Sequence, residues 1–345
     1  MPRAWPPRPT SSSTPVARSR RVITLTQSTP VATPDFIIAG AAKCGTTALW
    51  HYLDAHPEVG MTYIKEPRFF TEAKGGMAHG VVDAAIPRSG TYHRGWDWYD
   101  ELWRDAPEGG TRGEASTIYF VAQDAPRLIR QHVPDVRLIM MVRDPADRMY
   151  SHYWQEQKAG WDMGPFRDLV DTDHPRERYF ETTSHYKANI ERFLEHFDRD
   201  QIMVIVKEDL DNEPERILEE VFRFIGVDPA FRPASIGNRF NVQRLPRFPW
   251  IRRLSERLRA TVGVALPHPV RQAFGRTQRK LERRLSVPNA YPPLEPDLRA
   301  TLIERFEEDI RYIEQWVGRP RPSWRAIHPT EAAGKTPPAS PEATR

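Results

Sequence analysis

The segment from Phe36 to Thr47 reads FIIAGAAKCGTT, and the rest of the chain is best interpreted outward from it. Its first four residues, Phe36–Ala39, are apolar and predict a short buried strand. A turn of small residues follows, and we expect a helix over Thr46–Ala55. This order places backbone N–H groups and the positive end of a helix dipole around a space the size of a phosphate. The segment therefore predicts an anion-binding turn between a strand and a helix.

The spacing from Gly40 to Thr47 nearly matches the nucleotide-binding P-loop, GxxxxGK[ST]. In that loop a lysine follows the second glycine and reaches the β- and γ-phosphates. Here Thr46 occupies that position, and the loop's only lysine is Lys43. Such a loop suits one phosphate with a cation beside its breaking bond better than it suits ATP or GTP. An ordinary strand–turn–helix with a structural glycine turn is the alternative.

Strand-like apolar runs alternate with amphipathic helices along the chain. Residues 136–142 (VRLIMMV) and 202–206 (IMVIV) are typical of strands buried on both faces of a sheet. Apolar residues at helical spacing predict helices around 186–197, around 217–225 and, as one long helix, over 298–313. We therefore predict an α/β fold, a P-loop-like parallel sheet with helices on both faces. Ligands bind such sheets at the carboxyl ends of the strands, where the loop after Gly40 falls.

The region from Arg244 to Arg284 is strongly basic, with Arg and Lys far outnumbering acidic residues, although the whole chain has a formal net charge of only +4. We expect a basic helical insertion over 244–285. Basic amphipathic helices indicate peripheral membrane contact or an anionic ligand, and a solvated insertion beside the cleft is an equal alternative. Because the chain has no recognised nucleic-acid-binding module, we expect no nucleic-acid partner.

The length of 345 residues is sufficient for one large α/β domain, which we place at 35–324. Residues 1–34 and 325–345 are Pro-rich and are expected to be disordered tails, although the acid-free first segment also fits an organelle-targeting peptide. The only cysteine, Cys44, is either a reactive thiol or a small buried filler, and it excludes an intramolecular disulfide and a cysteine-based metal cluster. Since no apolar run is long enough to span a membrane, we expect a cytoplasmic protein without a signal peptide, with membrane association left open.

A second motif follows the strand at 136–142, where residues 142–154 read VRDPADRMYSHYW. Arg143 leaves the strand at its carboxyl end, and Ser151 comes eight residues later on the expected helix. Arginine offers planar bidentate donors and serine a hydroxyl, which together suit a second, isolated phosphate. A surface ion pair or a Walker-B-like acid at Asp144 would explain the Arg-Asp pair alone. Neither alternative explains two phosphate-type sites.

These two motifs resemble those of sulfotransferases that use 3′-phosphoadenosine 5′-phosphosulfate (PAPS), in the Golgi carbohydrate, heparan-type and bacterial branch. The resemblance implies that Arg143 and Ser151 bind the 3′-phosphate. It also implies that Lys43 neutralises charge on the bridging oxygen as the S–O bond breaks. The 5′-phosphate would be held by the loop residues Ala42, Lys43, Cys44, Gly45, Thr46 and Thr47.

Residues 65–70, KEPRFF, are similar to the E-x-x-F-F element of heparan-type sulfotransferases, whose glutamate is the catalytic base. The resemblance assigns Glu66 as the base that removes the proton of the acceptor hydroxyl, with Arg68 near the substrate. A surface ion pair between Glu66 and Arg68 is the structural alternative.

Residues 113–120, GEASTIYF, align with the family element G-E-K-[ST]-P-x-Y, but Ala115 replaces the lysine and Thr117 the proline. The missing lysine argues against a heparan-like acceptor. By resemblance, Glu114 and Ser116 line the substrate cleft. His185 and Tyr186 would approach the nucleotide or acceptor, or else only begin a helix.

The sequence thus predicts transfer of a sulfuryl group from PAPS to a hydroxyl acceptor such as a carbohydrate or glycolipid. Adenosine 3′,5′-bisphosphate would be the product, and no metal is expected. A P-loop kinase or NTPase is one alternative. A membrane-surface binding protein with a degenerate nucleotide site is another. The acceptor and the oligomeric state are not predicted.

Overall fold

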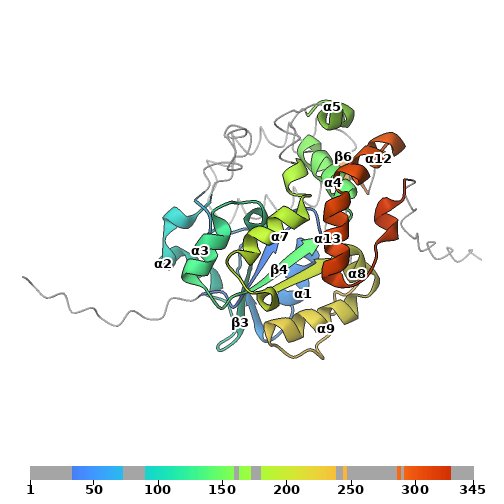
Figure 1. The fold of residues 1–345 in the computed structure, drawn as a ribbon. Coiled ribbons are helices and arrows are strands. Elements are labelled where there is room, and N and C mark those ends of the chain that lie inside the picture. Colours follow the sequence, from blue (N-terminus) through green and yellow to red (C-terminus); the bar gives the residue numbers. More distant parts are fainter. Residues whose placement is uncertain are drawn as a thin grey trace, which may run out of the picture. The chain divides into compact units, whose positions relative to one another are not determined.

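A computed structural model describes residues 33–72, 90–158, 163–171, 180–237, 244–246, 286–288 and 291–327. Its centre is a five-stranded sheet in the order β2-β3-β1-β4-β5 (Figure 1). Every pairing between neighbouring strands is parallel. The strands are β1 (Phe36–Gly40), β2 (Val59–Met61), β3 (Thr111–Ala115), β4 (Arg137–Val142) and β5 (Ile202–Val206). The predicted α/β fold with a parallel sheet is therefore confirmed.

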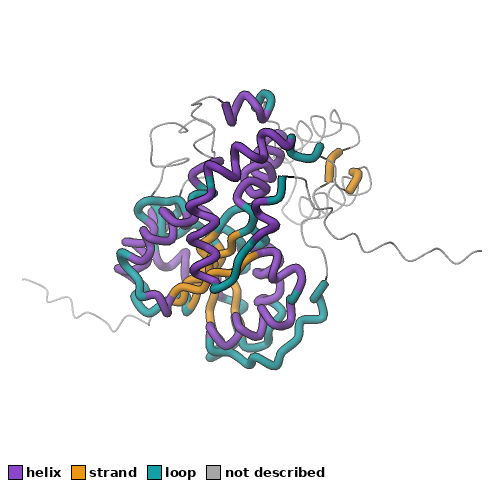
Figure 2. Tube along the Cα trace, turned by 45° about the vertical axis from the view of Figure 1, so that its right-hand side comes forward, coloured by secondary structure: helices purple, strands orange, loops and turns teal. Residues whose placement is uncertain are grey.

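The helices lie on both faces of this sheet. In Figure 1, α7 and α13 lie in front of the strands and α1 lies behind them, while Figure 2 shows the strands in orange running through the middle of the purple helices. The α-helices are α1 (Thr46–Asp54), α2 (Trp96–Asp100), α3 (Ala125–His132), α4 (Pro145–Lys158), α5 (Phe166–Asp171), α7 (Tyr186–Leu194), α8 (Lys207–Asn212), α9 (Pro214–Ile225), α12 (Pro296–Arg305) and α13 (Glu307–Val317).

Strand β1 forms the middle of the sheet, and all five of its residues are buried. Its Phe36 ring lies directly over Gly113 of β3, where a Cβ atom would come within 2.1 Å of the ring. Helix α9 ends as predicted at Gly226, which adopts the left-handed conformation (φ 83°) that favours glycine. The elements that carry the anion-binding turn therefore form where the sequence places them.

The long helix predicted over 298–313 is wrong, because the chain breaks at Phe306 into α12 and α13. Helix α12 packs against α4, whereas α13 packs against α7. Phe306 is fully buried at the break. A break at this residue allows the two helices to pack against different partners.

The basic insertion begins differently from the prediction. Residues Arg244–Pro246 form a strand, β6, that pairs antiparallel with β7 (Ser286–Pro288), so these three residues are not helical. Residues 247–285 lie outside the described part of the chain, as do 1–32 and 328–345. The helical insertion, its membrane contact and the disordered tails therefore stay predictions. Within the described residues, no helix is both long and apolar enough to cross a membrane.

Candidate active site

The carboxyl ends of the five parallel strands meet at one edge of the sheet. The loop 41–45 follows β1, and the segment containing Glu66 follows β2. Ser116 comes directly after β3, and Arg143 directly after β4. The parallel topology thus brings the predicted phosphate-binding and catalytic residues to the same edge, although they are far apart in the sequence.

The loop after β1 leaves donors without acceptors at the start of α1. The amide of Ala41 donates to the carbonyl of Met141 at 2.8 Å and ties the loop to β4. The amides of Gly45, Thr46 and Thr47 have no hydrogen-bond acceptor among the described residues, and no side chain caps α1. Together with the helix dipole, such amides favour an anion.

Lys43 and Cys44 occupy opposite environments within this loop. Lys43 has a left-handed backbone (φ 71°), and its Nζ donates to Oε1 of Gln155 on α4 at 2.7 Å. Cys44 is fully buried with its Sγ 3.9 Å from the hydroxyl of Tyr186. Burial raises the pKa of the Cys44 thiol to about 11, so the thiol is uncharged at neutral pH and acts as a buried filler.

Arg143 lies between the end of β4 and the start of α4. Asp144 begins α4 by accepting hydrogen bonds from the amides of Ala146 (3.0 Å) and Asp147 (3.1 Å). The Arg143 Nη2 atom lies 3.3 Å from Asp147 Oδ2. Its Nε is buried and has no hydrogen-bond partner in the described structure. An unsatisfied buried guanidinium N–H is suited to an anionic acceptor.

One face of α4 carries polar residues that the sequence analysis missed, apart from Ser151. Arg148, Ser151, His152 and Gln155 are spaced at i, i+3, i+4 and i+7, so they share a face, and Gln155 reaches Lys43. All but Gln155 are buried. Burial, Arg148 and then Lys43 lower the pKa of His152 well below its usual value. The repeat of polar residues at helical spacing is the sequence signal that could have identified Arg148, His152 and Gln155.

The Glu66 carboxylate is held by Thr117 and is 21% exposed. Its Oε1 accepts a hydrogen bond from Thr117 Oγ1 at 2.9 Å, and its Oε2 accepts one from the Thr117 amide at 3.0 Å. Lys65 Nζ also donates to Oε1 at 3.0 Å, while Arg68 Nε is 3.9 Å from Oε2. The hydrogen bonds from Thr117 thus fix the orientation of the carboxylate, and its exposed part remains accessible from solvent.

The backbone around Glu66 is fixed to β3 and the residue that follows it. The amide of Glu66 donates to the carbonyl of Ala115 at 2.8 Å, and the amide of Arg68 donates to Ser116 Oγ at 2.9 Å. Ser116 is fully buried. Its observed role is therefore to hold the segment after β2, and its predicted contact with substrate gains no support.

Glu114 is fully buried in β3, so its side chain presents no surface to a ligand. Burial raises the pKa of its carboxyl to about 8, while the neighbouring hydroxyls of Tyr119 and Tyr99 oppose the rise and the Glu66 charge adds to it. A carboxyl in this environment is mostly protonated at neutral pH. The predicted substrate contact of Glu114 is not supported.

His185 and Tyr186 lie at the start of α7, and the Tyr186 hydroxyl also lies beside Cys44 of the loop. The Tyr186 hydroxyl is buried and donates to the carbonyl of Arg143 at 2.7 Å. His185 lies 3.0 Å from Asp309 of α13 and 3.4 Å from Glu181. Burial opposes protonation, but these two carboxylates raise the pKa of His185 to about 9. The described contacts of His185 fit the helix-start alternative, whereas those of Tyr186 link α7 to the loop and to Arg143.

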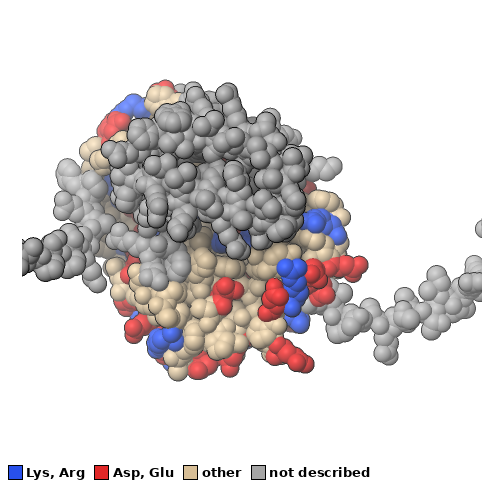
Figure 3. All heavy atoms as spheres, turned by 180° about the vertical axis from the view of Figure 1, so that it is seen from behind, with Lys and Arg blue, Asp and Glu red and all other residues tan. Residues whose placement is uncertain are grey.

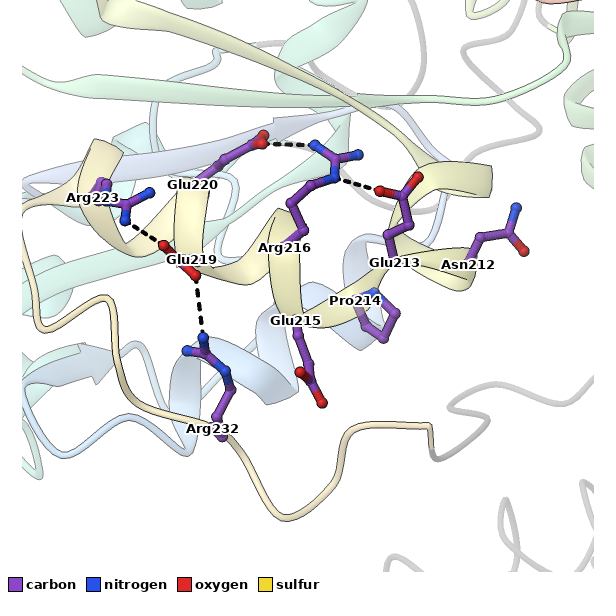
Figure 4. Close-up of a pocket in the computed structure, with 9 residues that line it drawn as sticks. All are labelled: Asn212, Glu213, Pro214, Glu215, Arg216, Glu219, Glu220, Arg223 and Arg232. Atoms are coloured by element: carbon purple, nitrogen blue, oxygen red, sulfur yellow. Dashed lines mark hydrogen bonds and ion pairs between the residues drawn. The ribbon is translucent and has the colours of Figure 1, made fainter.

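A shallow hollow of about 560 Å³ lies away from this edge, on the charged face of α9 (Figure 4). Its arginines are already paired: Arg216 with Glu213 and Glu220, and Arg223 and Arg232 with Glu219. Acidic and basic side chains are also interspersed on the described part of the face in Figure 3. This hollow offers a solvated ion-pair network and no catalytic arrangement.

Comparison with known proteins gives consistent matches. Residues 33–236 match the family model of the sulfotransferase domain. The chain is 29% identical over 212 residues to the bifunctional heparan sulfate N-deacetylase/N-sulfotransferase 4 of Mus musculus, covering 57% of this chain and 23% of that protein. It is 31% identical over 201 residues to the heparan sulfate glucosamine 3-O-sulfotransferase 3A1 of Mus musculus, and this match covers 56% of this chain and 46% of that protein. It therefore spans less than half the length of these relatives.

Among solved structures, the crystal structure of a sulfotransferase from Alicyclobacillus acidocaldarius superposes with a TM-score of 0.59 at 25% identity. The superposition covers 86% of this chain and all of the other chain. Lys43, Glu66, Arg143 and Ser151 all lie inside the region that the family model matches. With more than half of its length matched, the chain belongs to the sulfotransferase domain family.

Proposed function

We propose that this protein transfers a sulfuryl group from PAPS to a hydroxyl or amino group of a carbohydrate or similar acceptor. The observation that carries the proposal is that two separate groups of N–H donors, unpaired among the described residues and each suited to an anion, lie at one edge of the sheet. One is the uncapped start of α1 beside Lys43, and the other is Arg143 with its unpartnered buried Nε. Two of the relatives described above are named as an N-sulfotransferase and a 3-O-sulfotransferase of heparan sulfate, which supports a carbohydrate acceptor.

The donor is a substrate that carries a phosphosulfate on its 5′ side and a phosphate on its 3′ side. The amides of Gly45, Thr46 and Thr47 would bind the 5′-phosphate, because they are donors without acceptors at a helix start. Arg143, with Ser151 of α4, would bind the 3′-phosphate. A nucleotide with phosphates in a single row would engage only the first of these positions.

Transfer requires one bond to form at sulfur as another breaks. The acceptor oxygen or nitrogen attacks sulfur, the S–O bond to the 5′-phosphate breaks, and its electron pair stays on the phosphate oxygen. Lys43 would neutralise the charge that grows there. Glu66, whose carboxylate is oriented by two hydrogen bonds from Thr117, would take the acceptor's proton. In this mechanism Lys43 acts on the leaving phosphate oxygen, and Glu66 acts on the attacking acceptor group on the other side of the sulfur.

The test is transfer of label from ³⁵S-PAPS to a panel of glycans and simple glycosides, without added metal. We expect labelled product from the unaltered protein and none from Lys43→Ala. Lys187→Ala is the matched control, because Lys187 lies on α7 and pairs with Glu308 outside the candidate site. Equal transfer by Lys43→Ala, or phosphate transfer from ATP by the unaltered protein, would contradict the proposal.

A further inference from the structure

Arg299 of α12 lies beyond the region matched by the sulfotransferase family model, yet its side chain reaches the start of α4. Its Nη2 lies 2.6 Å from Asp144 Oδ2, and its Nη1 lies 2.9 Å from Asp147 Oδ1. Arg299 and Asp144 are 5% and 4% exposed. One guanidinium therefore bridges the two carboxylates that follow Arg143.

Asp147 is shared between two arginines. Its Oδ1 faces Arg299 at 2.9 Å, and its Oδ2 faces Arg143 at 3.3 Å. The shorter contact is the one to Arg299. If Arg299 were absent, Arg143 would be the only arginine paired with Asp147 among the described residues, so the pair with which a phosphate competes would be stronger.

The ion pairs of Arg299 with Asp144 and Asp147 also affect the balance of charge around Arg143. Glu208 is a third acid here, and its Oε1 accepts the Asp144 amide at 3.2 Å. Burial and Asp147 raise the pKa of Asp144, and Arg299 opposes that rise. The charges of Asp147 and Glu208 both act on Arg143. Without Arg299, the negative charge of Asp144 and Asp147 would be less well balanced, and this would disfavour a phosphate beside Arg143.

We propose that Arg299 is a positioning residue of the 3′-phosphate site, holding Asp144 and Asp147 so that Arg143 is available to the phosphate. The inference rests on the proposed function, because the anion it concerns is the 3′-phosphate of the donor. It makes nucleotide recognition depend on α12, a helix about 150 residues after Arg143 in the sequence.

The experiment measures the Kd of adenosine 3′,5′-bisphosphate and of adenosine 5′-monophosphate by titration calorimetry. The Kd of adenosine 5′-monophosphate divided by the Kd of adenosine 3′,5′-bisphosphate measures how much the 3′-phosphate adds to affinity, and this quotient is called the ratio below. Arg299→Met should reduce this ratio by about tenfold, within the range of couplings in one ion-pair network. The Kd of adenosine 5′-monophosphate should stay the same. Arg143→Ala gives the ratio expected when the site is lost.

Arg321→Met is the matched control. Arg321 also comes from the C-terminal segment, and it makes two 2.6 Å bonds to Asp209 at a similarly buried position. Losing this pair should lower the melting temperature but leave the ratio unchanged. A purely structural role for Arg299 would give the same result as this control.

Two further variants keep the test decisive if Arg299→Met does not fold. Arg299→Lys keeps the charge but cannot bridge both carboxylates as a fork, so the ratio should fall by less. Asp147→Asn removes the competing acid, so the ratio should rise, and Arg299→Lys should cost less in that background.

The outcomes separate the inference from the function on which it rests. A large ratio in the unaltered protein that is lost in Arg143→Ala but kept in both Arg299 variants would overturn the role of Arg299 alone. A ratio near one in the unaltered protein would overturn the 3′-phosphate site and the proposed donor with it.

Discussion

Glu66 owes its orientation to Thr117, at the position where the related motif has proline. Proline has neither an amide hydrogen nor a hydroxyl, so it could make neither of the two bonds that Thr117 donates to the carboxylate. The departure from the motif therefore adds support to the proposed base. At the position of the family's lysine, this chain has Ala115, which is fully buried.

Glu66→Gln should lower kcat by about 10²-fold or more, because the amide cannot accept the acceptor's proton. The Kd of adenosine 3′,5′-bisphosphate should change little, since the described contacts of the Glu66 carboxylate are with Lys65, Arg68 and Thr117 and not with either phosphate position. Steady-state kinetics and calorimetry on the same preparation measure both quantities. Normal turnover would show that another group is the base.

The raised pKa of Glu114 predicts how the stability of the folded protein depends on pH, and this prediction can be tested without measuring activity. Its pKa is raised by burial from the ordinary 4.5 to about 8 in the folded protein, so the folded state holds a proton that the unfolded state loses. Stability should therefore fall as pH rises from about 5 to about 8. Glu114→Gln cannot ionise and should lack this component.

Melting temperatures of both proteins between pH 5 and 8.5 test this. The unaltered protein should lose stability relative to Glu114→Gln across that range, and the difference should level off above it. Parallel curves would mean that Glu114 does not carry a buried proton.

At the scale of elements, β1, β4 and β5 could be predicted because each is a nearly continuous apolar run. Strand β3 could not, because it reads TRGEA, and it pairs with β1 and β2 with the Phe36 ring packed over Gly113. The break at Phe306 was likewise hidden, since the apolar spacing continues through it. These features depend on contacts between distant segments, which local periodicity does not report.

Gly113→Ala should destabilise the fold by about 1–3 kcal/mol through overpacking. The new methyl group would lie 2.1 Å from the Phe36 ring, between two central strands that leave little room to move. Urea unfolding followed by tryptophan fluorescence measures the change in the free energy of unfolding. An unchanged value would mean that β1 and β3 can separate without cost.

At the scale of the whole molecule, the candidate site combines residues predicted from local motifs with residues supplied by distant elements. Turn chemistry and position after apolar strands indicate the loop 41–47 and Arg143, whereas Glu66 is assigned by its resemblance to a family element. Gln155 and Arg299 could not be predicted, because their roles follow from contacts across 112 and 155 positions of sequence. The C-terminal helices thus take part in the site, although the family model ends at residue 236.

The central claim is that the ligand carries phosphates on both sides of a nucleoside and not in a row. Calorimetric titration of the unaltered protein with adenosine 3′,5′-bisphosphate and with ATP, in the absence of metal, tests it most directly. The bisphosphate should bind at least about tenfold more tightly than ATP, because only the bisphosphate reaches both the start of α1 and Arg143. Tighter binding of ATP, or equal binding of the two, would contradict it.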